Sequence, residues 1–501
     1  MQNSRKTSIQ IQVFGGYLLM AITLLKGLIF VPMYLSLIGS RLYGLWLASG
    51  GILVWLSMLD LGISQGLIQR IASHYGKKDY NKTGQYFVHG LLCYIALGCI
   101  FVLIGFLVSI PLPSLFKSES SEVDTLRRCF QLAVISNVLS IVNNVLRGFA
   151  SSLLRPLFSV ISALVFSLVG LCIIVYMLFE GHGLYSIPTG SLVTNTGLVA
   201  FNGGFAIFLV KQLKSRIFLD KVILSDLISI IPSLFGARLG ESLVKNIEPT
   251  IIAIMISPEL STAFAITRRA GDIVSQGLHI ILGSSIPSLT HLYGEGNLDR
   301  TTDSIKTLIS FVMFCSLGCF SCYIVGNEAF MTLWIKKEHY LGNLMSFLIG
   351  MGLLTNTVLN FLSAIHVCIG NINFSMRIVL VESIVRISLM VLLVYFISIL
   401  GIPLSIFFSC TLFSVVLGKK LDQKTKSHQI FPVKFSFVLS LFISAGIIVC
   451  FITIYPTVSS WATFIFMMLL VFFSLNLSYL LNFDYRMMLQ KSFTKTVSRI
   501  E

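Results

Sequence analysis

The chain has 501 residues, of which 55% are hydrophobic and only 11% charged. Water-soluble globular proteins carry about 25% charged residues, so the composition excludes a soluble domain and indicates a chain that lies largely in a membrane. In a soluble protein the net charge of +15 would suggest a nucleic-acid partner. The distribution of the Lys and Arg residues along the chain, described below, argues against such a partner.

Apolar runs of about 20 residues predict transmembrane helices. The first run is too long for the core of a signal peptide and lacks a small-residue cleavage site, so it is expected to remain as the first span. The sequence predicts an all-α polytopic membrane bundle with about 14 transmembrane helices, at residues 10–38, 43–70, 85–110, 127–148, 157–180, 186–210, 226–256, 262–289, 304–326, 342–366, 377–399, 402–418, 435–455 and 459–481.

Lys and Arg are distributed unevenly between the two sides of these spans. With both termini in the cytoplasm and residues at the very ends of a span counted with the adjacent segment, the cytoplasmic segments hold 24 of the 36 Lys and Arg residues, the external segments hold six and the spans hold six. Cytoplasmic segments of membrane proteins are enriched in these residues. The bias therefore predicts the orientation and accounts for the net charge without a nucleic acid.

The spans are expected to form two lobes. Residues 1–210 predict an N-terminal six-helix lobe, residues 226–418 a C-terminal one, and residues 419–501 two additional helices and a cytoplasmic tail. The cytoplasmic connector between the lobes, residues 211–225, reads KQLKSRIFLDKVILS and is predicted to be an amphipathic segment on the membrane surface.

The two lobes resemble each other faintly in sequence. YGKKDYNKT at residues 75–83 matches YGEGNLDRT at residues 293–301, an offset of 218 residues, and both segments follow the second span of their lobe. Six spans per repeat is an even number, so the repeats run in the same direction. We expect them to be related by a pseudo-twofold axis along the membrane normal, around a central cavity.

The seventh span contains four charged residues, Arg238, Glu241, Lys245 and Glu248. At 100° per residue they fall within an arc of about 80° on one face. Each would cost roughly 2.5–3.5 kcal/mol if it were unpaired in lipid. This face is therefore expected to contact protein or water.

The eighth span repeats the pattern with a stripe made of Arg268, Arg269, Asp272, Gln276 and His279, within an arc of about 100°. The first lobe adds Lys26 in the first span and Asp60 in the second. The cations Lys26, Arg238, Lys245, Arg268 and Arg269, with Gln276, are predicted to bind an anionic, polar substrate. The remaining residues are predicted to be coupling or cavity acid/base groups: Asp60, Glu241, Glu248, Asp272 and His279.

Structural roles compete with these predictions. The i,i+4 pair Glu382 and Arg386 in the eleventh span is best explained as a staple within its helix. Lys26 could instead snorkel to the interface or pair with Asp60. The ten cysteines lie mostly in apolar spans, and the C-x-x-C of Cys319 and Cys322 has no partner ligands nearby in sequence. No metal or other cofactor is therefore predicted.

Three segments resemble a known family. VPMYLSLIGSRLYGLW at residues 31–46, LDLGISQGLIQRIASHYGKKDYNK at residues 59–82 and PSLTHLYGEGNLDR at residues 287–300 resemble bacterial polysaccharide-repeat-unit transporters. These belong to the multidrug/oligosaccharidyl-lipid/polysaccharide exporter superfamily. The resemblance implies a flippase of the bacterial cytoplasmic (inner) membrane that moves a lipid-linked oligosaccharide, typically on undecaprenyl diphosphate, to the periplasmic leaflet. An O-antigen or similar surface-polysaccharide repeat unit would be its cargo.

The resemblance also implies partners: the lipid bilayer, a coupling ion (H⁺ or Na⁺), and a polysaccharide polymerase with its chain-length regulator. Two alternatives stay open. One is an ion-coupled multidrug exporter of the same superfamily, although a slight excess of cations over acids on the predicted cavity faces disfavours cationic drugs. The other is a membrane polysaccharide polymerase or glycosyltransferase. The chain contains no large external loop, P-loop or nucleophile motif, so we expect no enzyme.

Overall fold

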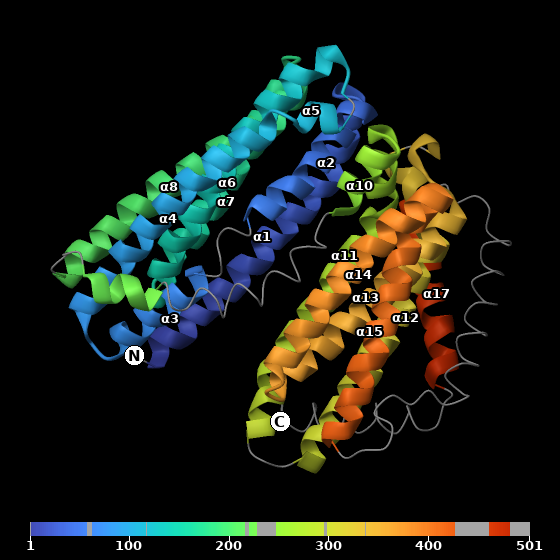
Figure 1. Cartoon of the computed structure of the whole chain (residues 1–501). Helices are drawn as coiled ribbons and strands as arrows, with labels where there is room; N and C mark the ends of the chain where they lie inside the picture. Colours follow the sequence, from blue (N-terminus) through green and yellow to red (C-terminus); the bar gives the residue numbers. More distant parts are fainter. Residues whose placement is uncertain are drawn as a thin grey trace. The chain divides into compact units, whose positions relative to one another are not determined.

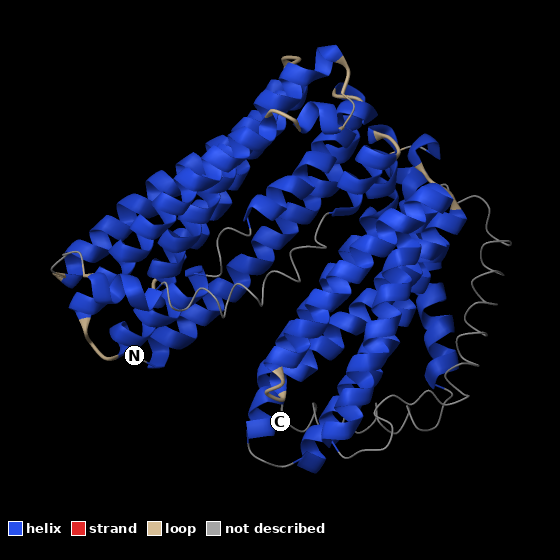
Figure 2. Cartoon of the chain, viewed as in Figure 1, coloured by secondary structure: helices blue, strands red, loops and turns tan. Residues whose placement is uncertain are grey.

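The computed structural model describes residues 2–57, 63–116, 118–215, 220–227, 247–294, 298–335, 337–425 and 460–480. Within these ranges all regular elements are helices and no strand occurs (Figure 2). The chain divides into two compact units, Met1–Thr262 and Ala263–Glu501.

The first unit is a bundle of long helices. Helix α6 packs against α4 and α8, α7 packs against α8 and α1, and α10 packs against α2. Phe87 and Phe149 stack at 4.0 Å within its core. Its helices are α1 (Gln2–Leu37), α2 (Ser40–Ser57), α3 (Ile63–Gly76), α4 (Tyr80–Ser109), α5 (Leu112–Leu115), α6 (Ser120–Ser152), α7 (Leu157–Phe179), α8 (Ser186–Leu213), α10 (Ile247–Met255) and the first residues of α11 (Pro258–Gly294).

The second unit contains the rest of α11 and a set of long helices packed side by side (Figure 1). Helix α15 packs against both α13 and α14, and α12 packs against α13 and α17. These helices are α12 (Leu298–Trp334), α13 (Asn343–Cys368), α14 (Ile372–Ile397), α15 (Gly401–Thr425) and α17 (Trp461–Leu480).

Most predicted spans match a described helix apart from its ends, and of the span 226–256 only residues 226–227 and 247–256 are described. Every predicted run contains a described helix apart from 435–455, which lies outside the described residues, and 43–70 corresponds to α2 and α3. Eight helices among the described residues are long and apolar enough to cross a membrane. The prediction of an all-helical membrane bundle is confirmed.

The span predicted for α12 is too short because apolarity marks the hydrocarbon core and not the end of a helix. The prediction for α12 was 304–326, whereas the helix has 37 residues. At 1.5 Å per residue it is about 55 Å long, well beyond a hydrocarbon core of about 30 Å. Its polar ends continue the helical hydrogen bonds on either side of that core.

The connector between the predicted lobes packs against the first unit. Helix α8 ends at Leu213, and Lys214 turns the chain with a left-handed φ of 50°. Residues 221–227 are helical, and Ile223 and Leu227 are buried in the same core cluster as Phe87 and Phe149. Ile223 thus packs into protein, whereas Val222 and Leu224 are exposed, so the prediction that the connector lies on the membrane surface stays a prediction.

The 218-residue offset also appears in the helices themselves. Helices α2 and α11 begin at Ser40 and Pro258, and α4 and α12 begin at Tyr80 and Leu298. Both pairs of first residues are separated by the offset of the short sequence match. The two helices of each pair therefore start at equivalent positions of the two repeats.

Candidate functional site

The polar stripe predicted in the eighth span lies on α11. One face of this helix packs into the second unit, where the carbonyl oxygen of Thr267 accepts hydrogen bonds from Tyr323 Oη (3.0 Å) and Asn327 Nδ2 (2.9 Å). Gly271, one turn later, lets the side chain of Leu353 approach the backbone closely. These contacts identify the face of α11 that belongs to the core of the second unit.

The stripe is centred about 120° around the helix from that packed face. Arg268 Nε donates to Asp272 Oδ1 at 2.8 Å, and the two side chains are 21% and 33% exposed. Gln276 and His279, further along the same side, are exposed. The structure therefore brings these four residues to one side of α11, where Gln276 and His279 are exposed and Arg268 and Asp272 are half-buried.

Arg269 differs from Arg268 in its hydrogen bonding. Its Nε is buried and has no hydrogen-bond partner among the described residues, while Arg268 is paired with Asp272. A guanidinium group carries five N–H donors and binds phosphate or carboxylate in a bidentate manner. Arg269 therefore has donor capacity to spare for an anionic group.

The stripe predicted in the seventh span is described only at its end. Arg238, Glu241 and Lys245 lie outside the described residues. Glu248 lies in α10 and is 5% exposed. This helix packs against α2, and Thr250 Oγ1 donates to the carbonyl oxygen of Ala48 at 2.7 Å. Glu248 is thus buried within the first unit.

Lys26 lies in α1, where it is half-buried and forms no ion pair with a described residue. The helix packs against α7, and Gly15 allows close contact with Val160. Asp60, the partner considered for Lys26, lies outside the described residues. The role of Lys26 as a substrate-binding cation stays a prediction.

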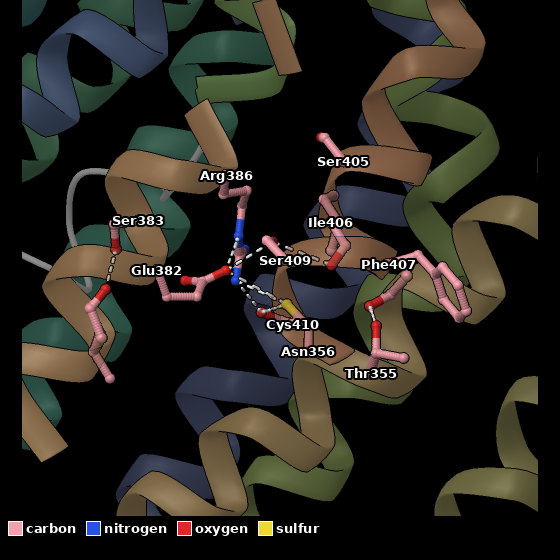
Figure 3. A network of polar contacts seen from close by, with 12 residues as sticks. Thr355, Asn356, Glu382, Ser383, Arg386, Ser405, Ile406, Phe407, Ser409 and Cys410 are labelled. Carbon is pink, nitrogen blue, oxygen red and sulfur yellow. Dashed lines mark hydrogen bonds and ion pairs between the residues drawn. The ribbon is translucent and has the colours of Figure 1, made fainter. Parts of the chain in front are cut away.

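Glu382 and Arg386 form a buried ion pair in the second unit (Figure 3). Arg386 Nε donates to Glu382 Oε1 at 2.7 Å, and its Nη2 donates to Asn356 Oδ1 at 3.0 Å. Ser409 Oγ donates to the same carboxylate oxygen at 2.9 Å. Glu382 and Arg386 are 1% and 5% exposed, so both charges are compensated in the interior. The predicted i,i+4 pair is confirmed, and its partners also connect α14 to α13 and α15.

Sequence reasoning missed an ionic cluster at the start of α2. Arg41 Nε donates to Glu122 Oε1 at 2.9 Å, and its Nη1 donates to Glu259 Oε1 at 2.9 Å. Glu122 also caps α6, because its Oε2 accepts the backbone N–H of Glu119. These partners are 81 and 218 residues away in sequence, so no local spacing could have indicated the cluster.

In the part of the chain that the structure describes, no group of three His, Cys, Asp or Glu residues could hold a metal ion. The thiol of Cys322 donates to the backbone carbonyl of Met468 at 3.3 Å. It therefore serves the packing of α12 against α17.

Comparison with known proteins gives a consistent fold. The MatE family model matches residues 47–176, and no curated protein sequence matches the chain. An inward-facing multidrug resistance MATE family transporter of the MOP superfamily is 14% identical, with a TM-score of 0.68 over 79% of this chain and 93% of that one. The lipid II flippase MurJ in an inward closed conformation is 12% identical, with a TM-score of 0.65 over 94% and 99%.

An outward-facing MATE transporter is also similar, with 15% identity and a TM-score of 0.57 over 84% of this chain and 96% of that one. At such low identities these likenesses establish the fold alone. Together with the eight apolar helices, they show that the chain is a multi-pass membrane protein with the fold of the MATE transporters and the MurJ flippase.

Proposed function

We propose that the protein is a transporter that flips a lipid-diphosphate-linked oligosaccharide, such as an O-antigen repeat unit, from the cytoplasmic to the periplasmic leaflet. It would work by alternating access between its two lobes, in the bacterial inner membrane with both termini in the cytoplasm. The observation that carries the proposal is the pair of adjacent cations on α11, where Arg268 is paired with Asp272 and Arg269 Nε has no hydrogen-bond partner among the described residues.

The chemistry of the cargo fits these residues. A diphosphate is anionic and accepts bidentate hydrogen bonds from guanidinium groups. Gln276, exposed on the same helix, has the donors and acceptors that sugar hydroxyls require. Lys26, Arg238 and Lys245 are proposed to add positive charge, whereas Asp272 orients Arg268 through its 2.8 Å ion pair.

Other predicted roles remain part of the proposal. Asp60, Glu241, Glu248, Asp272 and His279 are proposed as cavity or coupling groups for H⁺ or Na⁺. A polysaccharide polymerase and its chain-length regulator would act on the flipped product.

The test uses Arg268→Ala, Arg238→Ala and Lys26→Ala in a strain that lacks the chromosomal gene. We expect each variant to reach normal membrane levels and to lower the external accessibility of labelled lipid-linked sugar by about tenfold or more, since a charged hydrogen bond is worth about 1.5–3 kcal/mol. Arg268→Lys should be intermediate because it keeps the charge and loses the bidentate geometry. The control is Lys420→Ala, an exposed cation near the end of α15. Normal flipping by all three alanine variants would disprove the site.

A second candidate function is ion-coupled drug export, which the likeness to MATE transporters favours. Drug susceptibility in a pump-deficient strain separates the two functions. A flippase should leave susceptibility unchanged and restore surface polysaccharide. An exporter should raise drug resistance and leave the lipid-linked sugar on the cytoplasmic side.

A further inference from the structure

The first turns of α2 and α11 contact each other in a symmetrical way. Thr262 Oγ1 donates to the carbonyl oxygen of Ser40 at 2.7 Å. Gly44 lies so close to the carbonyl oxygen of Pro258 that a Cβ atom would collide with it. Positions 40 and 258 are equivalent under the 218-residue repeat, as are positions 44 and 262. The two contacts are therefore copies of each other.

Arg41 and Glu259 lie at the centre of this arrangement. They too are 218 residues apart, and Arg41 Nη1 donates to Glu259 Oε1 at 2.9 Å. A contact in which each residue meets its own equivalent is the mark of a twofold axis. The helix starts of the two repeats thus cross around a local twofold axis with one ion pair upon it.

The charged side chains at this crossing differ in how far they are exposed. The side chain of Glu122 is 10% exposed, whereas that of Glu259 is 41% exposed and that of Arg41 is 33% exposed. A partly solvated ion pair contributes little to stability. The Arg41–Glu259 contact can therefore break easily, while the guanidinium group keeps its buried partner Glu122.

The uncharged contacts of the crossing are also suited to separation. They include the side-chain hydrogen bond of Thr262 and the close approach of Gly44 to the carbonyl oxygen of Pro258. Helix α11 leaves the first unit after Thr262 and continues as part of the second. A displacement of its first turn from α2 would therefore be passed along the helix towards Arg268.

We propose that this crossing, made of Ser40, Arg41 and Gly44 with Pro258, Glu259 and Thr262, is a latch that closes the predicted external side and separates once in each transport cycle. The proposal rests on the proposed alternating-access function, in which cargo must leave on that side. In the open state Arg41 stays with Glu122, and Glu259 moves away with α11.

The first experiment measures how fast a disulfide forms across the latch and does not depend on transport. Ser40→Cys and Thr262→Cys are combined in a chain with a protease site in the connector, so that an oxidant-induced disulfide holds the two fragments together. The chain with native cysteines only is the background. We expect cross-linking in the parent pair and a several-fold lower rate when Gly44→Ala is added, because the new methyl group meets a backbone atom.

Gly50→Ala is the matched control, since a Cβ atom at this position of the same helix meets nothing within 4 Å. Glu259→Gln is a second variant that weakens the ion pair without a clash and should also lower the rate. Failure of the parent pair to cross-link, or equal rates in Gly44→Ala and Gly50→Ala, would overturn the latch.

The second experiment measures transport of lipid-linked oligosaccharide by the cysteine pair. Oxidation should stop transport, and a reductant should restore it. Continued transport by the cross-linked protein would overturn the latch while leaving the flippase proposal intact. No transport by the unmodified protein would disprove the proposed function, whereas the cross-linking rates would still test whether the crossing opens.

Discussion

Arg386 and Glu382 show how a full charge is tolerated in the interior of the second unit. Both are almost completely buried, and the carboxylate also accepts a hydrogen bond from Ser409. Removing one member of a buried pair leaves the other charge uncompensated, at a cost of about 3–5 kcal/mol. Glu382→Gln should therefore lower the melting temperature of the purified protein markedly.

A double substitution separates charge from packing. Glu382→Leu with Arg386→Met should be more stable than Glu382→Gln, because it leaves no buried charge. Arg377→Met, at an exposed position of the same helix, is the control and should leave the melting temperature nearly unchanged. Equal losses in the single and double variants would show that the pair acts through packing alone.

Local spacing predicted the ion pair of Glu382 and Arg386, explains the ion pair of Arg268 and Asp272, and could not indicate the cluster around Arg41. Arg268–Asp272 and Glu382–Arg386 are both four residues apart on a helix, and helix geometry brings such residues together. Arg41 joins Glu122 and Glu259 across 81 and 218 residues. Only the repeat offset carried information about one of these partners, since a contact on a twofold axis joins equivalent positions.

The connector shows what decides the placement of an element. His89 is 3% exposed; its Nδ1 lies 2.8 Å from the carbonyl oxygen of Gln85, and its Nε2 lies 2.8 Å from the backbone nitrogen of Asp220. A carbonyl only accepts and a backbone N–H only donates, so His89 is neutral with its proton on Nδ1. Asp226 accepts from Arg70 and Tyr86 at 2.8 and 2.9 Å. These contacts join residues more than 100 positions apart, so local patterns in the sequence could not predict them.

Replacing His89 should loosen the connector. His89→Leu leaves the N–H of Asp220 without its acceptor, which costs about 1–3 kcal/mol, and local opening exposes the backbone to proteases. We expect trypsin to cleave near Lys214 and Lys221 about 5- to 10-fold faster. His182→Leu, at an exposed position outside this contact, should cleave at the wild-type rate. An unchanged rate in His89→Leu would mean that the buried apolar residues alone hold the connector.

The repeat organises the molecule more than its sequence reveals. Nine residues indicated the offset, yet the starts of two helix pairs and three contacts at one crossing obey it. The predicted substrate-binding residues are distributed unequally between the two repeats. Among the described residues, their stripe lies on α11.

The latch predicts how the stability of the closed form depends on pH. Burial disfavours the charged form of Glu259, but hydrogen bonds from its own backbone, Arg41 and Ser257 outweigh this effect and lower the pKa of its carboxyl group. The hydrogen bond to Glu122 raises the pKa of Arg41. A carboxyl group with a lowered pKa stabilises the closed form above its ordinary pKa of about 4.3, and this contribution is lost only as the pH falls through the lower value.

Cross-linking of the chain that carries Ser40→Cys and Thr262→Cys should therefore keep a constant extent between about pH 5 and 8 once corrected for thiolate reactivity. When Glu259→Gln is added, the extent should be lower and equally flat, because the titrating partner is gone. A fall centred near neutral pH in the parent pair, absent from Glu259→Gln, would contradict the lowered pKa. It would mean that proton binding at Glu259 opens the external side, which would make this carboxyl group the point where transport is coupled to protons.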